Sequence, residues 1–120
     1  MAELDRLEQM LEKHWEIQAK VFGHEFDIMT NEEKIVFIKD MVLSATNELH
    51  EAMRETGWKA WSTSRHIHLD LYVNELVDVY CLLMNLFLVT GMYPNEVAEE
   101  LFQRVSQKQQ LNVQRQESGY

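Results

Sequence analysis

The amino-acid sequence predicts an all-α fold: a bundle of four to five helices that forms one domain over residues 1–120. Apolar residues recur at spacings of three, four and seven, which is typical of amphipathic helices. The 4 glycines and the single proline fall between these periodic segments. A hydrophobic fraction of 46% in 120 residues supplies enough apolar surface for one core, which excludes a disordered chain.

The first two helices are predicted by apolar spacing and by a capping signal. The residues that share one face of the first helix are Leu4, Leu7, Leu11, His14 and Val21. This helix is expected to end near Gly23. Thr30 and Glu33 form a capping box, so the second helix begins there and ends around Gly57.

The third and fourth helices follow a polar loop, GWKAWSTSRH. The third is expected to begin near His66 or Leu69 and to run to Thr90, because Gly91 suits the position after a helix. Pro94 suits the first turn of the fourth helix. Residues 107–120 are polar, and we expect a ligand or partner to order this tail.

The third helix is the most apolar segment of the chain. Nearly every position from Leu76 to Val89 is apolar, which predicts a helix buried on most sides. Three other helices of a 120-residue chain cover too little surface to achieve this. We therefore expect a homodimer, or a dimer of dimers, that shares the third helix at its interface; the alternative is a monomer whose other helices wrap the third unusually well. The segment from Val79 to Val89 is too short for a membrane span, so no membrane partner is expected.

Charge and cysteine content narrow the classes of function. Twenty acidic and 11 basic residues give a net charge of -9, which argues against nucleic acid as a partner. Cys81 is the single cysteine, so neither an intrachain disulfide nor a cysteine-based zinc site is expected. The sequence MAELDRLEQMLEKHW lacks the apolar stretch of a signal peptide, which favours a cytoplasmic location.

Two pairs of carboxylates interrupt apolar stripes of the second and third helices. Glu48 and Glu51 lie three residues apart on the second helix, and Glu75 and Asp78 repeat this spacing on the third. Antiparallel packing would gather four carboxylates in a partly desolvated space, where an unpaired cluster is costly. Mg²⁺ prefers such oxygen ligands, and Mn²⁺ accepts them as well. The alternative is that either pair belongs to a solvated surface, but two pairs aligned with apolar stripes favour a metal site.

These residues resemble a known family. Glu48-x-x-Glu51 followed by Glu75-x-x-Asp78 is similar to the ExxE…ExxD signature of the all-α NTP pyrophosphatase (MazG-like) superfamily. The segments NELHEAMRETGWKAW and NELVDVYCLLMNLFL resemble the dimeric and phage-encoded dUTPases in particular. The resemblance implies a Mg²⁺-dependent enzyme that hydrolyses a nucleoside triphosphate, dUTP or another dNTP, to the monophosphate and pyrophosphate. A phage-encoded enzyme of this kind would act in the host cytoplasm.

The resemblance also implies roles for individual residues. Glu48, Glu51, Glu75 and Asp78 would bind the metal, and Glu48 would also orient or deprotonate the attacking water. The expected substrate-binding residues are Lys59, Trp61, Lys108, Asn112, Arg115 and Tyr120, and Gln18 is added to them because its amide could reach a base edge, although the first helix shows no match to the family. Among them, Lys59, Lys108 and Arg115 would contact phosphate, and Trp61 a base or sugar. For the cationic residues and Asn112 the alternative is a solvated surface side chain, and for Trp61 it is an aromatic ring that anchors the loop to the core.

Departures from the family pattern leave base specificity open. Cys81 stands where the dUTPases often have histidine, and Asn47 stands where a typical MazG motif has a second glutamate. A MazG-like or dCTP-preferring dNTP pyrophosphatase is therefore the first alternative. The second belongs to another class: a catalytically silent helical dimerisation module.

Overall fold

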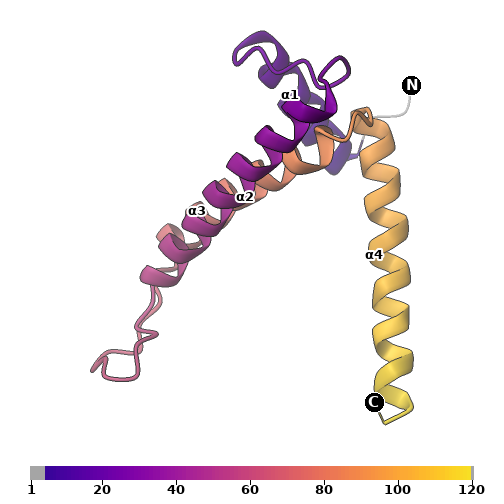
Figure 1. Ribbon diagram of the computed structural model, residues 1–120. Helices are drawn as coiled ribbons and strands as arrows, with labels where there is room; N and C mark the ends of the chain where they lie inside the picture. The colour runs from indigo at the N-terminus through magenta and orange to yellow at the C-terminus, as the bar shows by residue number, and fades with distance from the viewer. Residues whose placement is uncertain (1–4, 120) are drawn as a thin grey trace.

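The computed structural model describes residues 5–119 and confirms the all-α class. The described residues form four helices, α1 (Arg6–Lys20), α2 (Asn31–Arg54), α3 (Leu69–Leu88) and α4 (Pro94–Glu117) (Figure 1). No strand forms in this part of the chain, and Thr56 and Ile67 make one isolated antiparallel bridge within the loop between α2 and α3.

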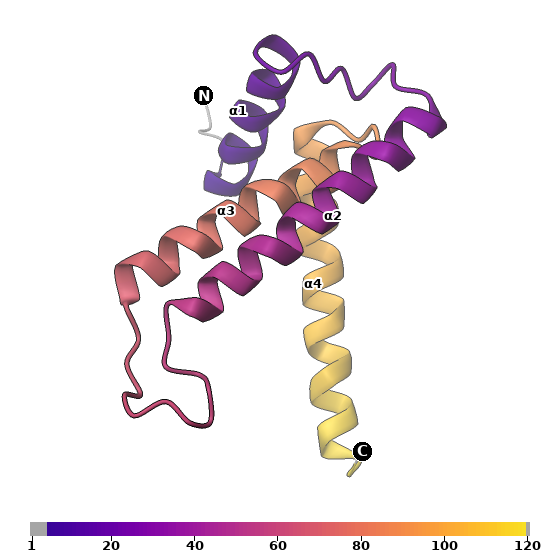
Figure 2. The ribbon, with the colours of Figure 1, turned by 60° about the vertical axis from the view of Figure 1, so that its left-hand side comes forward.

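Two arms diverge from a common junction. Helices α2 and α3 lie side by side as an antiparallel hairpin, which is the first arm (Figure 2). Helix α1 packs on α3 and α4 at the junction, and α4 extends away from the hairpin as the second arm (Figures 1 and 2).

The hydrophobic core occupies the junction. The largest fully buried side chains are Leu11, Phe26, Leu88, Val89 and Val97. They come from α1, the α1–α2 loop, the end of α3 and the start of α4. These contacts hold the two arms together at one end. Beyond the junction, α2 and α3 pack on each other, and the distal half of α4 is exposed.

Local signals fix the helix ends much as the sequence predicts. The Thr30 hydroxyl accepts from the Glu33 backbone N–H at 3.2 Å, and Glu33 accepts from the Thr30 N–H at 3.1 Å, which confirms the capping box. Helix α2 ends at Arg54, three residues before Gly57, because the chain turns there into the bridge of Thr56. Gly91, with φ of 95°, follows α3, and Pro94 begins α4.

The segment expected as a polar tail is helical. Helix α4 continues without interruption to Glu117, so most of residues 107–120 belong to it. All described side chains beyond Leu101 are exposed. The final residue, Tyr120, lies outside the described residues.

A single chain does not bury α3 on most sides. Only Val79, Met84, Asn85 and Leu88 of this helix are buried. Among the described residues α3 is the one helix that is long and apolar enough to cross a membrane by length and composition, a test that core helices of soluble proteins also pass. Cover by a partner subunit stays a prediction.

Candidate metal and nucleotide site

Three glutamates meet in the half of the hairpin that is nearer to the α2–α3 loop. Glu48 and Glu51 of α2 and Glu75 of α3 each offer a carboxylate oxygen, and these oxygens lie within 4.8 Å of one another. The antiparallel packing of α2 on α3 creates this arrangement, because it places Glu75 opposite the first acidic pair. The structure thus brings together three of the four predicted metal ligands.

The cluster carries unpartnered acceptors. One oxygen of Glu48 (Oε2) and one of Glu75 (Oε2) are inaccessible to solvent and, while both carboxylates are ionised, have no hydrogen-bond donor among residues 5–119. A proton shared with Glu48, partial burial and the charges of Glu51 and Glu48 raise the pKa of Glu75 to about 7. A carboxyl cluster of this kind holds either a proton or a cation. Its all-oxygen donor set fits Mg²⁺ or Mn²⁺.

Asp78 does not join the three glutamates. It is exposed and lies one turn along α3 from Glu75. Glu51 stands at the same three-residue step from Glu48 and joins the cluster, whereas Asp78 is more exposed than the three glutamates. Burial, and to a lesser extent the charge of Asp78, raise the pKa of the Cys81 thiol. The predicted fourth ligand is therefore near the cluster but outside it.

The loop between α2 and α3 begins one turn after Glu51 and holds two predicted substrate contacts. Lys59 and Trp61 are exposed, and the Lys59 ammonium lies 5.6 Å from the centre of the Trp61 ring. The loop folds back on itself because the Arg65 guanidinium donates to the carbonyl oxygens of Gly57 at 2.8 Å and Lys59 at 3.1 Å. Sequence reasoning assigned no role to Arg65, since a lone arginine in a polar loop carries no distinctive signal.

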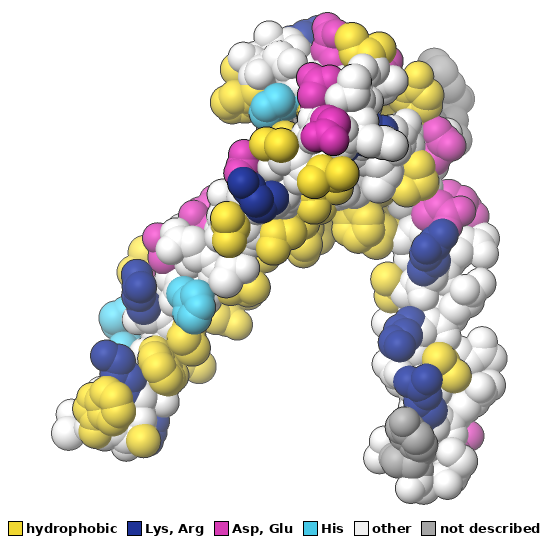
Figure 3. Space-filling view, in the orientation of Figure 1, with side chains coloured by type: hydrophobic (Ala, Val, Ile, Leu, Met, Phe, Trp, Pro, Cys, Tyr) yellow, Lys and Arg dark blue, Asp and Glu magenta, His cyan; other side chains and the backbone are white. Residues whose placement is uncertain are grey.

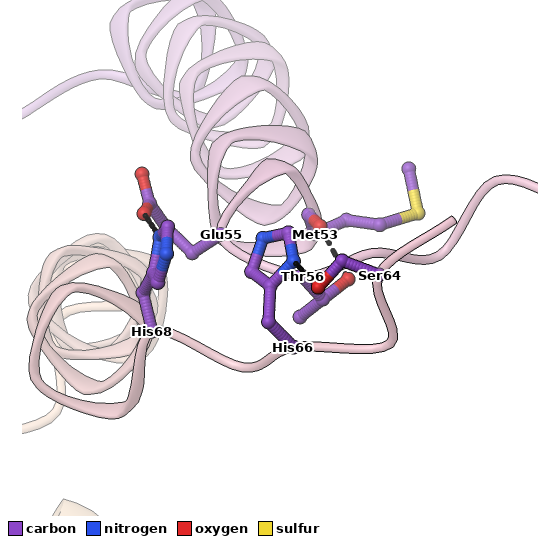
Figure 4. A network of polar contacts seen from close by, with 6 residues as sticks. All are labelled: Met53, Glu55, Thr56, Ser64, His66 and His68. Carbon is purple, nitrogen blue, oxygen red and sulfur yellow. Dashed lines mark hydrogen bonds and ion pairs between the residues drawn. The ribbon is translucent and has the colours of Figure 1, made fainter. Parts of the chain in front are cut away.

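A histidine pair supports the base of this loop. His68 Nδ1 lies 3.3 Å from Glu55 Oε2, and His66 Nδ1 lies 3.0 Å from the Ser64 hydroxyl (Figure 4). The two imidazole rings are 4.5 Å apart between centroids. These contacts anchor the loop where it enters α3.

Lys108, Asn112 and Arg115 lie together but away from the glutamates. They occupy one side of the distal half of α4, and this arm diverges from the hairpin that carries the acids (Figure 1). One chain therefore does not bring these predicted phosphate contacts to the carboxylates of the same chain.

Gln18 has a structural partner at the junction. It is buried, and its side-chain oxygen lies 2.6 Å from His24 Nδ1. His24 in turn packs edge-on against Phe37 of α2. Phe37 and Glu48 are eleven residues apart on α2, about 16 Å along the helix axis. Gln18 therefore holds the α1–α2 connection, and the structure does not bring it to the carboxylates.

Comparison with protein-family models, curated proteins and solved structures found no match. The interpretation of the site therefore depends on its geometry and on the sequence motifs.

Proposed function

We propose that this protein is a Mg²⁺-dependent nucleoside triphosphate pyrophosphohydrolase with dUTP as its expected substrate. The observation that carries the proposal is the Glu48–Glu51–Glu75 cluster, with its two solvent-inaccessible, unpartnered carboxylate oxygens. Chains do not retain such oxygens for packing, because unpaired charge is costly to desolvate. A hard dication removes that cost.

In this proposal, residues in and around the cluster bind the metal ion, activate the attacking water and contact the substrate. The three glutamates bind the ion, with Asp78 next to them, and Glu48 also orients or deprotonates the attacking water. When bound, Mg²⁺ offsets the negative charge of the phosphate oxygens and lowers the pKa of water. Lys59 meets a phosphate oxygen, and the Trp61 ring stacks on the base or sugar.

The exposed apolar surface of the hairpin favours a second candidate, a catalytically silent helical dimerisation module. Such a module has no use for a half-buried carboxylate cluster with two solvent-inaccessible oxygens, whereas a pyrophosphohydrolase needs carboxylates to hold its metal. We therefore rank the enzyme first. A MazG-like or dCTP-preferring enzyme would use the same metal site with a different base contact.

A substrate panel tests the proposal. Purified protein is incubated with Mg²⁺ and each of dUTP, dCTP, dTTP, dATP and dGTP, and the release of pyrophosphate and monophosphate is followed. We expect turnover of dUTP in wild type and loss of turnover in Glu75→Gln, which keeps the shape of the side chain and removes its charge. Preference for dCTP would support the first alternative, and no hydrolysis of any nucleotide would refute the enzymatic proposal.

A further inference from the structure

The two acidic pairs lie in the same short sequence pattern. Residues 47–51 on α2 are Asn-Glu-Leu-His-Glu, and residues 74–78 on α3 are Asn-Glu-Leu-Val-Asp. In each copy an asparagine precedes the first acid and stands four residues before the second. The chain therefore offers two copies of one arrangement, and the two can be compared directly.

The copies differ in where the second acid lies. Glu51 is half-buried and joins Glu48 and Glu75 in the cluster, whereas Asp78 is exposed and stays outside it. The helix position does not separate them, since each stands three residues after a cluster glutamate. The difference therefore comes from the side chains and their contacts.

A side-chain hydrogen bond accompanies the acid that joins the cluster. The Asn47 amide Nδ2 donates to Glu51 Oε1 at 3.3 Å. In the other copy, and within residues 5–119, no such bond links Asn74 to Asp78, whose side chain is one methylene group shorter than that of glutamate. An amide donor is thus present in the copy whose second acid lies inside the cluster and absent from the other.

The bond orients Glu51 and leaves it able to bind an ion. At about 100° per residue, Glu51 stands about 40° around the helix from Asn47 and about 60° from Glu48, so it lies between them. A carboxylate oxygen that accepts one amide hydrogen keeps a second lone pair, and the other oxygen keeps both. Hydrogen bonds to metal-binding carboxylates fix the direction of the ligand in this way.

The cluster lies at a boundary between packed and solvated surface, where a side chain needs such a restraint. Asn47 and Asp78 are exposed, and the three glutamates are half-buried. Figure 3 shows acidic side chains along the outer side of the hairpin arm and hydrophobic side chains on the side that faces α4. A long carboxylate side chain at this boundary exchanges among rotamers, and each rotamer that turns to water removes it from the cluster.

The other two glutamates of the cluster are restrained differently. Glu48 Oε2 and Glu75 Oε2 are inaccessible to solvent, and these two side chains share a proton across the hairpin. Glu51 is absent from the solvent-inaccessible, unpartnered oxygens of the described residues, and its oxygen accepts from Asn47. Glu51 is therefore the member of the cluster whose direction depends on a neighbouring amide.

We propose that Asn47 is a positioning residue of the metal site, whose amide holds Glu51 within the cluster. Asp78, which has no such bond, stays outside it. The hydrogen bond is a property of the metal-free chain, and its effect on metal binding rests on the proposed function. An exposed pair four residues apart contributes little to helix stability, so Asn47 acts on the direction of the ligand and not on the fold.

Side-chain couplings test the hydrogen bond in the metal-free protein. Three-bond couplings across the Cα–Cβ bond of Glu51, measured by NMR in a chelator, show whether one rotamer or several are populated. We expect one dominant rotamer in wild type and in Asn47→Gln, which keeps an amide donor, and averaged couplings in Asn47→Ala. Asp78 should show averaged couplings in wild type. Averaging at Glu51 in wild type, or a single rotamer that persists in Asn47→Ala, would overturn the proposal.

Calorimetric titration with Mn²⁺ tests the consequence for the ion. Asn47→Ala should bind Mn²⁺ about tenfold more weakly than wild type, and Asn47→Gln within about threefold of it. Asn74→Ala is the matched control, since it removes the same side chain from the same place in the other copy, and its affinity should equal that of wild type. Neither alanine variant should melt below wild type in chelator, because alanine favours helices more than asparagine does.

Three results of this titration would refute the positioning role. They are equal affinity of Asn47→Ala and wild type, equal losses in the two alanine variants, and a lower melting temperature of Asn47→Ala in chelator. The last result would show that Asn47 supports the fold and not the ligand.

Hydrolysis separates this inference from the proposed function. A wild type that binds Mn²⁺ and hydrolyses no nucleotide would refute the enzyme, and the affinities of the variants would still decide the role of Asn47. A wild type that binds no Mn²⁺ would refute both the metal site and a role for Asn47 in it. In an active enzyme, Asn47→Ala should need about tenfold more Mg²⁺ for half of its maximal rate. An unchanged Mg²⁺ requirement would contradict the proposal.

Discussion

The raised pKa of Glu75 predicts an inverted pH dependence for the metal-free protein. In the folded chain this carboxyl titrates at about 7, against an ordinary value of 4.5. Between these two pH values the unfolded chain has lost the proton and the folded chain retains it. The unfolded state therefore binds fewer protons, and the free energy of unfolding falls as the pH rises from about 4.5 to about 7.

Mg²⁺ should counteract this trend because it binds the ionised carboxylate. With a pKa of about 7, about one tenth of Glu75 is ionised at pH 6 and about nine tenths at pH 8. The apparent affinity for Mg²⁺ should therefore rise roughly tenfold over this range. Stability in the presence of saturating Mg²⁺ should change less with pH than stability in a chelator.

Thermal unfolding followed by circular dichroism at 222 nm measures both effects. Wild type in chelator should melt at a lower temperature at pH 7.5 than at pH 5.5. Glu75→Gln should show a smaller decrease, and the difference between the two proteins isolates the contribution of Glu75 from that of all other groups. A melting temperature that rises over this range more in wild type than in Glu75→Gln, or identical profiles for the two proteins, would refute the reasoning.

Three further substitutions test the packing. Leu88→Ala removes a fully buried side chain from the junction and should lower the free energy of unfolding by about 2–5 kcal/mol in chemical denaturation. Gly57→Ala places a methyl group 1.9 Å from the Ser64 carbonyl oxygen, so the loop should shift and the free energy of unfolding should fall by ~1–3 kcal/mol. A variant as stable as wild type would show that Ser64 does not lie against Gly57. His14→Leu leaves the buried Asn85 side-chain oxygen, now 2.5 Å from His14 Nε2, without its partner and should cost about 1–3 kcal/mol; a neutral result would place another donor at Asn85.

Helix positions were predictable because their signals are local. The Thr30–Glu33 capping box, Gly91 and Pro94 each act within a few residues, and each marks the helix end expected of it. The meeting of Glu75 with Glu48 was predictable too, since an antiparallel hairpin follows from two apolar stripes joined by one loop.

The direction of α4 and the exposure of α3 were not predictable from periodicity. Apolar spacing shows that Leu76 and Leu83 need cover, but it does not tell a core of the same chain from a partner subunit. Residues 107–117 form a helix that apolar spacing does not reveal, because this segment has no continuous apolar face. Its glutamine, lysine and arginine residues nevertheless have high helix propensity. Asp78 matched the motif, yet it is exposed and lies outside the cluster, although Glu51 at the equivalent spacing lies inside it.

Direct ion binding tests the central claim that the glutamates are gathered for a dication. Free Mn²⁺ has a six-line electron paramagnetic resonance signal that is lost on binding, and added Mg²⁺ returns it by competition. Wild type and Glu12→Gln, which alters an exposed glutamate of α1, should bind Mn²⁺ equally, and Glu75→Gln should bind it at least tenfold more weakly. Equal affinity in all three proteins, or no loss of signal with wild type, would contradict the account.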